Sequence, residues 1–285
     1  MEFKAFKMDG LGNDFVIIDN RSNNVELNKD QIIKICDRNF IGCDQLVYIN
    51  NSDNADADLE FYNSDGSAAD ACGNGTRCVA FLLSKEKNTK NISVQVASKQ
   101  LNSKLLDDGQ VETIIGVPKT NWNEIPLSKK LDTKNLGIII EDNNNQAVSG
   151  GIAINVGNPH AIFFVNDVEN FNLEKIGPEI ENHEFFPEKC NFTLAQKLNE
   201  NHYKIKVWER GAGLTKACGT AACATAVAAN LEKLENSRTE IEFSLGKLII
   251  SIDESQQIHM KGPVSSICLL YTSDAADERS SVDLG

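Results

Sequence analysis

The chain has 285 residues, of which 41% are hydrophobic, and it carries a formal net charge of −13. This length suffices for one large or two moderate domains with a sizeable core. The acidic charge argues against a nucleic-acid or anionic-membrane surface, because both favour clustered Lys and Arg. We therefore expect a small-molecule partner, with no nucleic acid and no membrane.

The location predicted from the sequence is cytoplasmic. No run approaches the roughly 18 consecutive apolar residues that span a membrane. The opening segment "MEFKAFKMDG" lacks the apolar centre of a signal peptide.

Short runs rich in β-branched residues, bounded by Asn, Asp, Ser or Gly, predict strands along the whole chain. Helical spacing appears in "DQIIKICDR" and in the segments that follow two cysteines, Cys72 and Cys218. The predicted strands are 15–19, 45–50, 92–98 and 111–117 in the first half and 151–156, 160–165, 203–210 and 247–253 in the second.

Three pairs of landmarks indicate an internal duplication. Asn13 precedes Cys72 by 59 residues, and Asn158 precedes Cys218 by 60. Asn63 and Glu209 each precede the corresponding cysteine by nine residues. The two cysteines lie 146 residues apart, so the repeat is about half the chain.

The fold class predicted from the repeat is α/β, of the α+β type. We expect two pseudo-symmetric lobes, each a curled, mostly antiparallel sheet around a central helix, with the active site in the cleft between them. The "CATAVAANL" segment is rich in alanine, which allows tight packing inside a sheet.

Eight cysteines permit several interpretations. A cytosolic setting disfavours structural disulfides. Zinc sites favour closely paired cysteines or Cys/His clusters, whereas the closest pairs here are Cys72/Cys78 and Cys218/Cys223. We expect most of the others to be small buried hydrophobic residues, namely Cys36, Cys43, Cys78, Cys190 and Cys223.

Cys72 and Cys218 differ because each stands before glycines at a predicted helix entrance. A thiol there feels the positive end of the helix dipole, which favours the thiolate. The exposed amides can also hold a carboxylate, and glycine allows a ligand to approach. Two such thiols on opposite faces of one α-carbon suit stereoinversion without a cofactor. The glycines are Gly73, Gly75 and Gly219.

Long motifs in both halves resemble the signatures of the diaminopimelate epimerases. They are "FYNSDGSAADACGNGTRC", "NVGNPHA" and "WERGAGLTKACGTAAC", and the similarity runs from Phe3 to about Pro263. The resemblance implies an isomerase that interconverts LL- and meso-diaminopimelate on the route to lysine and cell-wall peptide. It implies no pyridoxal phosphate and no metal, and it suggests a homodimer.

The resemblance also assigns roles. Cys72 and Cys218 are the two bases, and the loops Gly73-Asn74 and Gly219-Thr220 grip the reacting carboxylate. His160 lies close to the thiols and helps to poise them, as does Glu209. The positions that line the substrate pocket are Asn13, Gln45, Asn63, Asn158, Asn191, Glu209 and Arg210.

Each assignment has a plainer alternative. Asparagines commonly form turns, His160 would then be a core histidine, and Arg210 with Glu209 a surface ion pair. A substrate charged at both ends argues against these alternatives, since it needs an Arg, which binds a carboxylate in a bidentate manner.

The end of the chain departs from the resemblance. The run "CLLYTSDAADE", residues 268–278, reads like a translated sequencing adapter, so we expect residues 268–285 to be a non-native tail outside the fold. The predicted domains are residues 1–118, with the first cysteine, and 119–267, with the second. The last strand is expected to return to the N-terminal lobe.

Two kinds of rival function stay open. Proline racemase-like enzymes of the same superfamily keep the cysteine pair but act on a smaller substrate, and phenazine-biosynthesis-like isomerases lack the pair. A non-catalytic binding or redox protein would use Cys72 and Cys218 as a disulfide switch. Arg210, Glu209 and Asn191 argue against a switch, which needs no pocket for a charged substrate.

Overall fold

The structure is a computed structural model that describes residues 3–22, 25–69, 72–97 and 99–272. The chain divides into two compact units. The first comprises residues 1–113 and 262–285, and the second residues 114–261.

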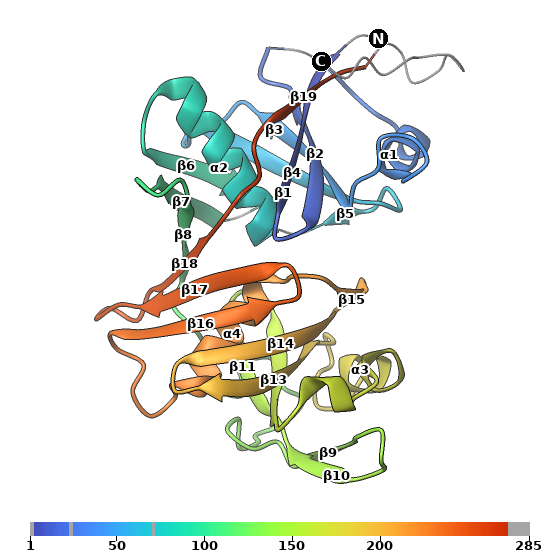
Figure 1. Ribbon diagram of the computed structural model, residues 1–285, viewed down its shortest axis with the longest axis vertical. Coiled ribbons are helices and arrows are strands. Elements are labelled where there is room, and N and C mark those ends of the chain that lie inside the picture. Colours follow the sequence, from blue (N-terminus) through green and yellow to red (C-terminus); the bar gives the residue numbers. More distant parts are fainter. Residues whose placement is uncertain (1–2, 23–24, 70–71, 98, 273–285) are drawn as a thin grey trace. The chain divides into compact units, whose positions relative to one another are not determined.

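The first unit is a sheet with two helices, shown in the upper part of Figure 1. Its strands are β1 (Phe3–Gly10), β2 (Asn13–Asp19), β3 (Gln45–Asn50), β4 (Ala57–Asn63), β5 (Ala68–Ala69), β6 (Asn91–Val96), β7 (Lys99–Leu105), β8 (Val111–Gly116, which runs on into the second unit) and β19 (Cys268–Thr272). Its helices are α1 (Lys29–Cys36) and α2 (Gly73–Lys87).

Helix α1 begins at a signal that the sequence carries locally. The side chain of Asn28 accepts a hydrogen bond from the Gln31 amide, and the Gln31 side chain accepts one from the Asn28 amide. This reciprocal capping satisfies two donors that the first turn would leave unpaired.

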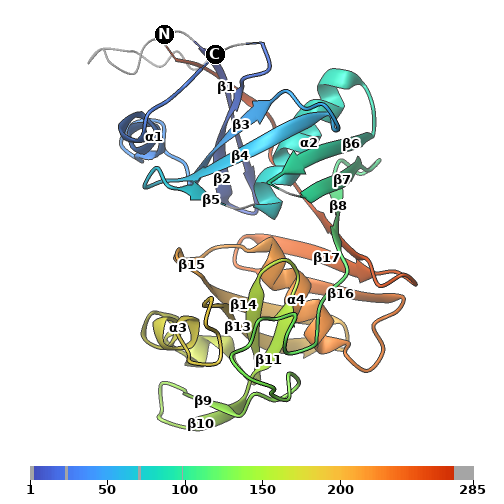
Figure 2. The same cartoon turned by 180° about the vertical axis from the view of Figure 1, so that it is seen from behind.

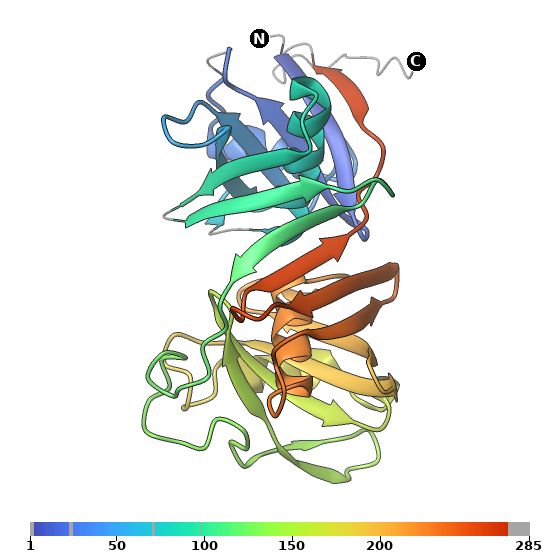
Figure 3. The ribbon, with the colours of Figure 1, turned by 90° about the vertical axis from the view of Figure 1, so that its left-hand side faces the viewer.

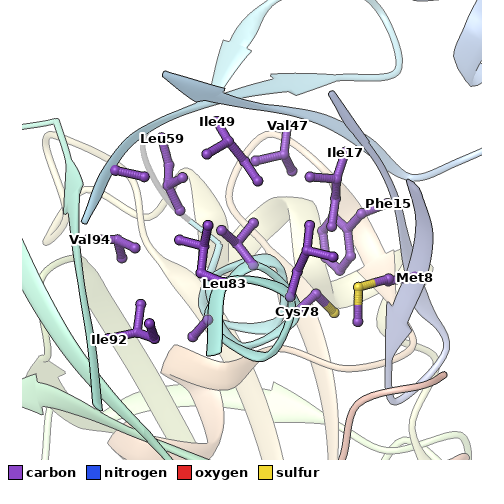
Figure 4. Packing of buried hydrophobic residues seen from close by; sticks show 14 of the residues in the cluster. Met8, Phe15, Ile17, Val47, Ile49, Leu59, Cys78, Leu83, Ile92 and Val94 are labelled. Atoms are coloured by element: carbon purple, nitrogen blue, oxygen red, sulfur yellow. The ribbon is translucent and has the colours of Figure 1, made fainter. Parts of the chain in front are cut away.

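Helix α2 is the centre of the first unit and contacts β1, β2, β6 and β7. Figure 4 shows Cys78 and Leu83 of the helix directed at Ile17, Val47 and the other apolar side chains of the surrounding strands. Cys78 and Leu83 are both fully buried. Burial of this apolar surface contributes about 25 cal/mol per Å².

The second unit contains ten strands and two α-helices among its described residues. The strands are β9 (Ile138–Glu141), β10 (Ala147–Gly150), β11 (Ile152–Asn155), β12 (Pro159–Val165), β13 (Asn191–Asn199), β14 (His202–Glu209), β15 (Gly213–Thr215), β16 (Ser237–Phe243), β17 (Gly246–Ile252) and β18 (Ile258–Gly262, whose last residue begins the return to the first unit). The helices are α3 (Leu173–Glu181) and α4 (Gly219–Ala229), with a 3₁₀ turn η1 at Val168–Asn170.

Helix α4 is the centre of the second unit. Figure 3 shows it, in orange, enclosed by the strands, and it contacts β11, β12, β13, β16 and β17. It is apolar on all sides, as expected for a helix without a solvent face. Five alanines let the strands approach closely, and its buried alanines are Ala221, Ala222, Ala224, Ala226 and Ala228.

Six strand pairings of the first unit recur in the second. In the first unit β1/β2 is antiparallel, β2/β3 parallel, β3/β4 and β4/β5 antiparallel, β4/β6 parallel and β6/β7 antiparallel. In the second unit β11/β12, β12/β13, β13/β14, β14/β15, β14/β16 and β16/β17 follow the same order and directions. The duplication seen in the sequence is therefore a duplication of topology.

The hairpin β9/β10 has no counterpart among the described residues of the first unit. Figure 2 labels it on the second unit, and its register pairs Ile138 with Gly150. It covers a separate apolar cluster that includes Ile138, Ile140, Ile176 and Ile180. Helix α3, which the sequence did not predict, supplies the last two residues.

The chain end contains a strand that the sequence analysis placed outside the fold. β19 pairs antiparallel with β1, with Lys7 opposite Cys268 (Figure 1). The Ser265 amide also donates to the Asp9 carbonyl at 2.8 Å, and Leu270 packs on the first unit's core. The expectation that the whole tail lies outside the fold is wrong for residues 268–272, because β1 offers them an open edge. Residues 273–285 lie outside the described residues.

Candidate active site

Two helices begin directly after a cysteine. Cys72 is the N-cap of α2 and Cys218 the N-cap of α4, and neither side chain makes a capping hydrogen bond. The first amides of a helix have no partner within the helix. The residues that follow, Gly73-Asn74 and Gly219-Thr220, therefore provide N–H groups suited to a carboxylate.

In the first unit, an asparagine amide lies against the thiol. The Sγ of Cys72 donates to Oδ1 of Asn13 at 3.4 Å, and Nδ2 of Asn74 donates to the same oxygen at 3.2 Å. The Nδ2 of Asn13 donates to Oδ2 of Asp44 at 3.0 Å. One carbonyl oxygen thus accepts from both Cys72 and the first turn of its helix.

Two more polar residues of the first unit face each other across β3 and β4. The Nε2 of Gln45 donates to Oδ1 of Asn63 at 3.0 Å, and Nδ2 of Asn63 donates to Oγ of Ser67 at 3.1 Å. The Oε1 of Gln45 is buried and accepts no hydrogen bond from the described part of the chain. Buried acceptors normally have a donor, so this oxygen suits the ammonium group of a ligand.

In the second unit, the thiol lies beside a carboxylate. Burial and the charge of Glu209 raise the pKa of Cys218 well above its usual value. Oγ1 of Thr220 lies 3.4 Å from the sulfur, and Oγ1 of Thr215 donates to Oε1 of Glu209 at 2.5 Å. The helix start does favour the thiolate of Cys218 through the Ala221 amide, but desolvation and a nearby anion penalise that form more strongly.

His160 is fully buried and neutral in this environment. Its Nε2 lies 2.9 Å from Oδ1 of Asn158. Because that partner is an acceptor, Nε2 carries the ring proton and Nδ1 is an unprotonated acceptor. Burial and the Arg210 cation lower the pKa of His160 to about 3.

Asn191 connects Arg210 to the strand that carries His160. The Arg210 amide donates to Oδ1 of Asn191 at 3.0 Å, and Nδ2 of Asn191 donates to the Pro159 carbonyl at 3.0 Å. The Nη1 of Arg210 donates to the Glu188 carbonyl at 3.0 Å. These contacts fix the direction in which the guanidinium leaves the end of β14.

The strand register adds one correspondence between the units. In the parallel pair β2/β3 Phe15 lies opposite Gln45, and in the parallel pair β12/β13 His160 lies opposite Asn191. Gln45 and Asn191 therefore occupy the same place in the two repeats, and His160 takes the place of Phe15. The second repeat has a polar ring where the first has an apolar one.

The family model of the diaminopimelate epimerases matches residues 5–120 and 152–267. A diaminopimelate epimerase of Pelagibacter ubique is 67% identical over 267 residues, covering 94% of this chain and 97% of the relative. Another, from Zymomonas mobilis, is 38% identical and covers 94% of this chain and 96% of the relative. The chain belongs to the diaminopimelate epimerase family.

The stretch that the epimerase family model leaves unmatched, residues 121–151, contains the β9/β10 hairpin. The duplicated elements are thus the ones that the model covers. The match ends at residue 267, immediately before β19.

Solved structures of related folds agree with this family. A hydroxyproline epimerase of Agrobacterium vitis has a TM-score of 0.66 at 12% identity and covers 96% of this chain and 94% of its own. A phenazine biosynthesis protein of Bacillus anthracis, of the PhzF family, has a TM-score of 0.67 at 13% identity, covering 96% of this chain and 100% of its own. At these identities the likeness concerns the fold alone, and it confirms the two-lobed α/β class.

The residues predicted for an epimerase site divide between the two units. The first unit holds Cys72 with Asn13, Gln45, Asn63, Gly73 and Asn74, and the second holds Cys218 with Asn158, His160, Asn191, Glu209, Arg210, Gly219 and Thr220. Sequence reasoning missed three neighbours that the hydrogen bonds reveal: Asp44, Arg77 and Thr215. The only signal for Arg77 was its place near the start of the helix after Cys72.

Gly75 has a different role from the one predicted. A Cβ at this position would lie 2.7 Å from Cε1 of Phe61 and 3.1 Å from Cε1 of Phe15. The residue is required because α2 packs closely on two aromatic rings, not because a ligand approaches it.

Two features are absent from the described residues. No helix in that part of the chain is long and apolar enough to cross a membrane. The same residues contain no group of three or more His, Cys, Asp and Glu side chains placed to hold a metal ion.

Proposed function

We infer that the chain is a diaminopimelate epimerase, an isomerase that interconverts LL- and meso-diaminopimelate in lysine biosynthesis. The observation that carries this is the relative of that name at 67% identity over nearly its whole length. The two cysteine N-caps on corresponding helices support it, because inversion of a carbon centre needs a base and an acid.

We propose that Cys72 and Cys218 are the two catalytic residues. With one substrate epimer, the thiolate of one cysteine takes the α-proton, and the thiol of the other donates its proton to the opposite face of the carbanion. The pair exchanges roles for the reverse reaction, so the protein ends each turnover in the opposite protonation state. No cofactor enters the proposed reaction.

The developing negative charge spreads into the α-carboxylate. The amides of Gly73-Asn74 and Gly219-Thr220 hold that group in the proposal, since preorganised N–H donors stabilise charge as it forms. In the proposal, Asn13, Asn158 and His160 lie next to the reacting groups. His160 is an acceptor through Nδ1 and not a cation.

The far end of the substrate carries another carboxylate and ammonium. Arg210 is assigned to the carboxylate because a guanidinium binds it with two parallel hydrogen bonds. Gln45, Asn63, Asn191 and Glu209 supply the oxygen acceptors for an ammonium. The Oε1 of Gln45 supports this, being buried with no donor in the described part of the chain.

The remaining partners are also proposals. We propose a homodimer in the cytoplasm, with neither a nucleic-acid nor a membrane partner, consistent with the net charge of −13. The origin of residues 268–285 as a non-native tail likewise stays a prediction.

The test follows solvent hydrogen in deuterated water, starting from LL-diaminopimelate. Early in the reaction the meso product should carry deuterium at the inverted carbon, while recovered LL-substrate stays protonated. Substrate that gains deuterium as fast as product would contradict separate roles for the two cysteines. Cys72→Ala and Cys218→Ala variants should each lose inversion.

A parallel incubation with L-proline, followed by chiral analysis, distinguishes a diaminopimelate epimerase from a proline racemase-like enzyme. We expect no D-proline. Inversion of proline without turnover of diaminopimelate would refute the substrate assignment, and inversion of neither would favour a non-catalytic protein.

A further inference from the structure

A chain of hydrogen bonds passes beneath Cys72 from a cation to an anion. The Nη2 of Arg77 donates to Oδ1 of Asn74 at 2.9 Å, and Nδ2 of Asn74 donates to Oδ1 of Asn13 at 3.2 Å. The Nδ2 of Asn13 then donates to Oδ2 of Asp44 at 3.0 Å. Cys72 donates to the middle of this chain, at Oδ1 of Asn13.

The two ends of this series of hydrogen bonds, Arg77 and Asp44, determine which way both amides point. A guanidinium only donates, so Asn74 must present its oxygen to Arg77 and its nitrogen to Asn13. A carboxylate only accepts, so Asn13 must present its nitrogen to Asp44 and its oxygen to Asn74. Consequently the group that faces the sulfur of Cys72 is a carbonyl oxygen, which receives a thiol proton.

Arg77 is a cationic side chain in a buried position. Its side chain is 0% exposed, and the adjoining Asn74 is 1% exposed. A Cβ at Gly10 would lie 3.3 Å from Nη2 of Arg77 and 3.2 Å from Cβ of Asn74, so β1 leaves room for both. Burial of a charge costs solvation free energy.

The second repeat shows that the fold itself does not need this series of hydrogen bonds. At the 146-residue period, Asn74 corresponds to Thr220 and Arg77 to Cys223. Helix α4 forms and packs with a buried cysteine at that position. The cation is therefore specific to the half of the molecule that holds Cys72.

We propose that Arg77 and Asp44 are positioning residues that lock the amides of Asn74 and Asn13 so that Oδ1 of Asn13 faces the sulfur of Cys72. The fixed amides hold the Cys72 thiol in one direction before it donates its proton. The catalytic consequence rests on the proposed function, whereas the orientation of Asn13 does not.

The first test measures Cys72 without substrate, by the rate of iodoacetamide alkylation followed by peptide mass spectrometry. In Asp44→Asn, residue 44 can also donate, so turning the N–H of Asn13 to the sulfur, which stabilises the thiolate, costs only the hydrogen bond from Asn74 and no longer the one to residue 44. We expect alkylation to be at least about threefold faster. In an Asn13→Ala background the same Asp44→Asn change should have little effect, because no amide remains to turn.

An equal acceleration in both backgrounds would mean that Asp44 acts by its charge alone, and it would overturn the proposal. Asp19→Asn is the matched control, since Asp19, at the end of β2, is another carboxylate of the first unit but pairs with Arg21. That control should leave the alkylation rate of Cys72 unchanged. This readout stands even if diaminopimelate proves not to be the substrate.

The second test compares Arg77→Met with Arg77→Lys. Methionine fills the space without a charge but leaves Oδ1 of Asn74 without its donor, so thermal stability should fall, and kcat should fall by about tenfold or more with a smaller change in KM. Lysine keeps a donor-only cation and should restore most of kcat. A stable Arg77→Met variant with wild-type kcat would overturn the role of Arg77. If that variant does not fold, the alkylation rates of Asp44→Asn with and without Asn13→Ala still decide the proposal.

Discussion

Cys72 and Cys218 enter their helices with nearly the same backbone conformation. The φ and ψ angles are −135° and 115° for Cys72 and −132° and 115° for Cys218. Their surroundings differ, because a neutral amide oxygen faces Cys72 and a carboxylate lies beside Cys218. The duplication thus preserved the placement of each thiol in its own repeat while the charges around the two diverged.

The carboxylate of Glu209 should control the reactivity of Cys218. Glu209→Gln removes the anion that helps to raise the pKa of this thiol, so more thiolate should form at pH 8 and iodoacetamide should label Cys218 faster. Glu169→Gln, an exposed change on the same unit, is the control. Slower labelling in Glu209→Gln would show that the carboxylate acts on Cys218 in some other way.

His160 should make the free energy of unfolding depend on pH. Its pKa is about 3 in the folded protein and near 6.5 when unfolded. Its contribution is present above pH 6.5 and is lost as the pH falls towards 3, because only the unfolded state then binds the proton. Between pH 7 and pH 5 the wild type should lose about 2 kcal/mol more than His160→Gln.

Urea unfolding of the two proteins at both pH values checks this. A His160→Gln protein with the same loss as the wild type would show that His160 is not buried in neutral form. In the wild type, the ring Hε1 resonance of His160 should also stay constant from pH 5 to pH 8.

Arg210→Lys should keep the fold and lower kcat/KM by at least about tenfold. Lysine offers a point charge where the proposal requires a bidentate grip. Arg238→Lys changes an exposed residue of β16 and should leave kcat/KM unaltered. Equal kinetics for the two variants would show that Arg210 does not hold the distal carboxylate.

Oxidation should act on two separate pairs of thiols. The sulfur atoms of Cys36 and Cys43 lie 3.4 Å apart, and a disulfide requires about 2.05 Å. Hydrogen peroxide can convert this pair to a disulfide, with release of two water molecules. In a Cys72→Ser/Cys218→Ser protein, mass spectrometry should detect the Cys36–Cys43 link, and a further Cys43→Ser change should abolish it.

The activity of the enzyme should depend on the other pair. Mild oxidation should inactivate the wild type and Cys43→Ser to the same extent, and reductant should restore both, because the catalytic thiols must be free to exchange protons. Protection by Cys43→Ser would instead link the loss of activity to the buried pair.

The chain end offers a truncation with its own control. Deletion of residues 273–285 should leave the melting temperature and activity unchanged. Deletion of 268–285 also removes β19, so β1 loses one of its two antiparallel partners and the first unit should melt at a lower temperature. Equal melting temperatures for the two truncated proteins would mean that β19 contributes nothing to the fold.

Much of the local structure followed from the sequence. All eight predicted strands and the three predicted helices are present, because β-branched runs, a capping box and alanine-rich helical spacing act over a few residues. Helix α3 was missed. It contains Pro178 and begins at Asn172, whose side chain caps it, so its signal was weak beside the apolar contacts that hold it.

The duplication and both cysteines were also evident in the sequence, since repeat spacing needs no knowledge of contacts. The charge around each thiol was not. Asp44 lies 31 residues from Asn13, and Glu209 reaches Cys218 from the end of another strand. Such contacts depend on strand register, in which a shift of one residue turns every side chain to the other face. The sequence by itself therefore determined which residues begin the two helices, and only the tertiary structure decided that the thiol of Cys72 faces an amide oxygen while that of Cys218 lies beside a carboxylate.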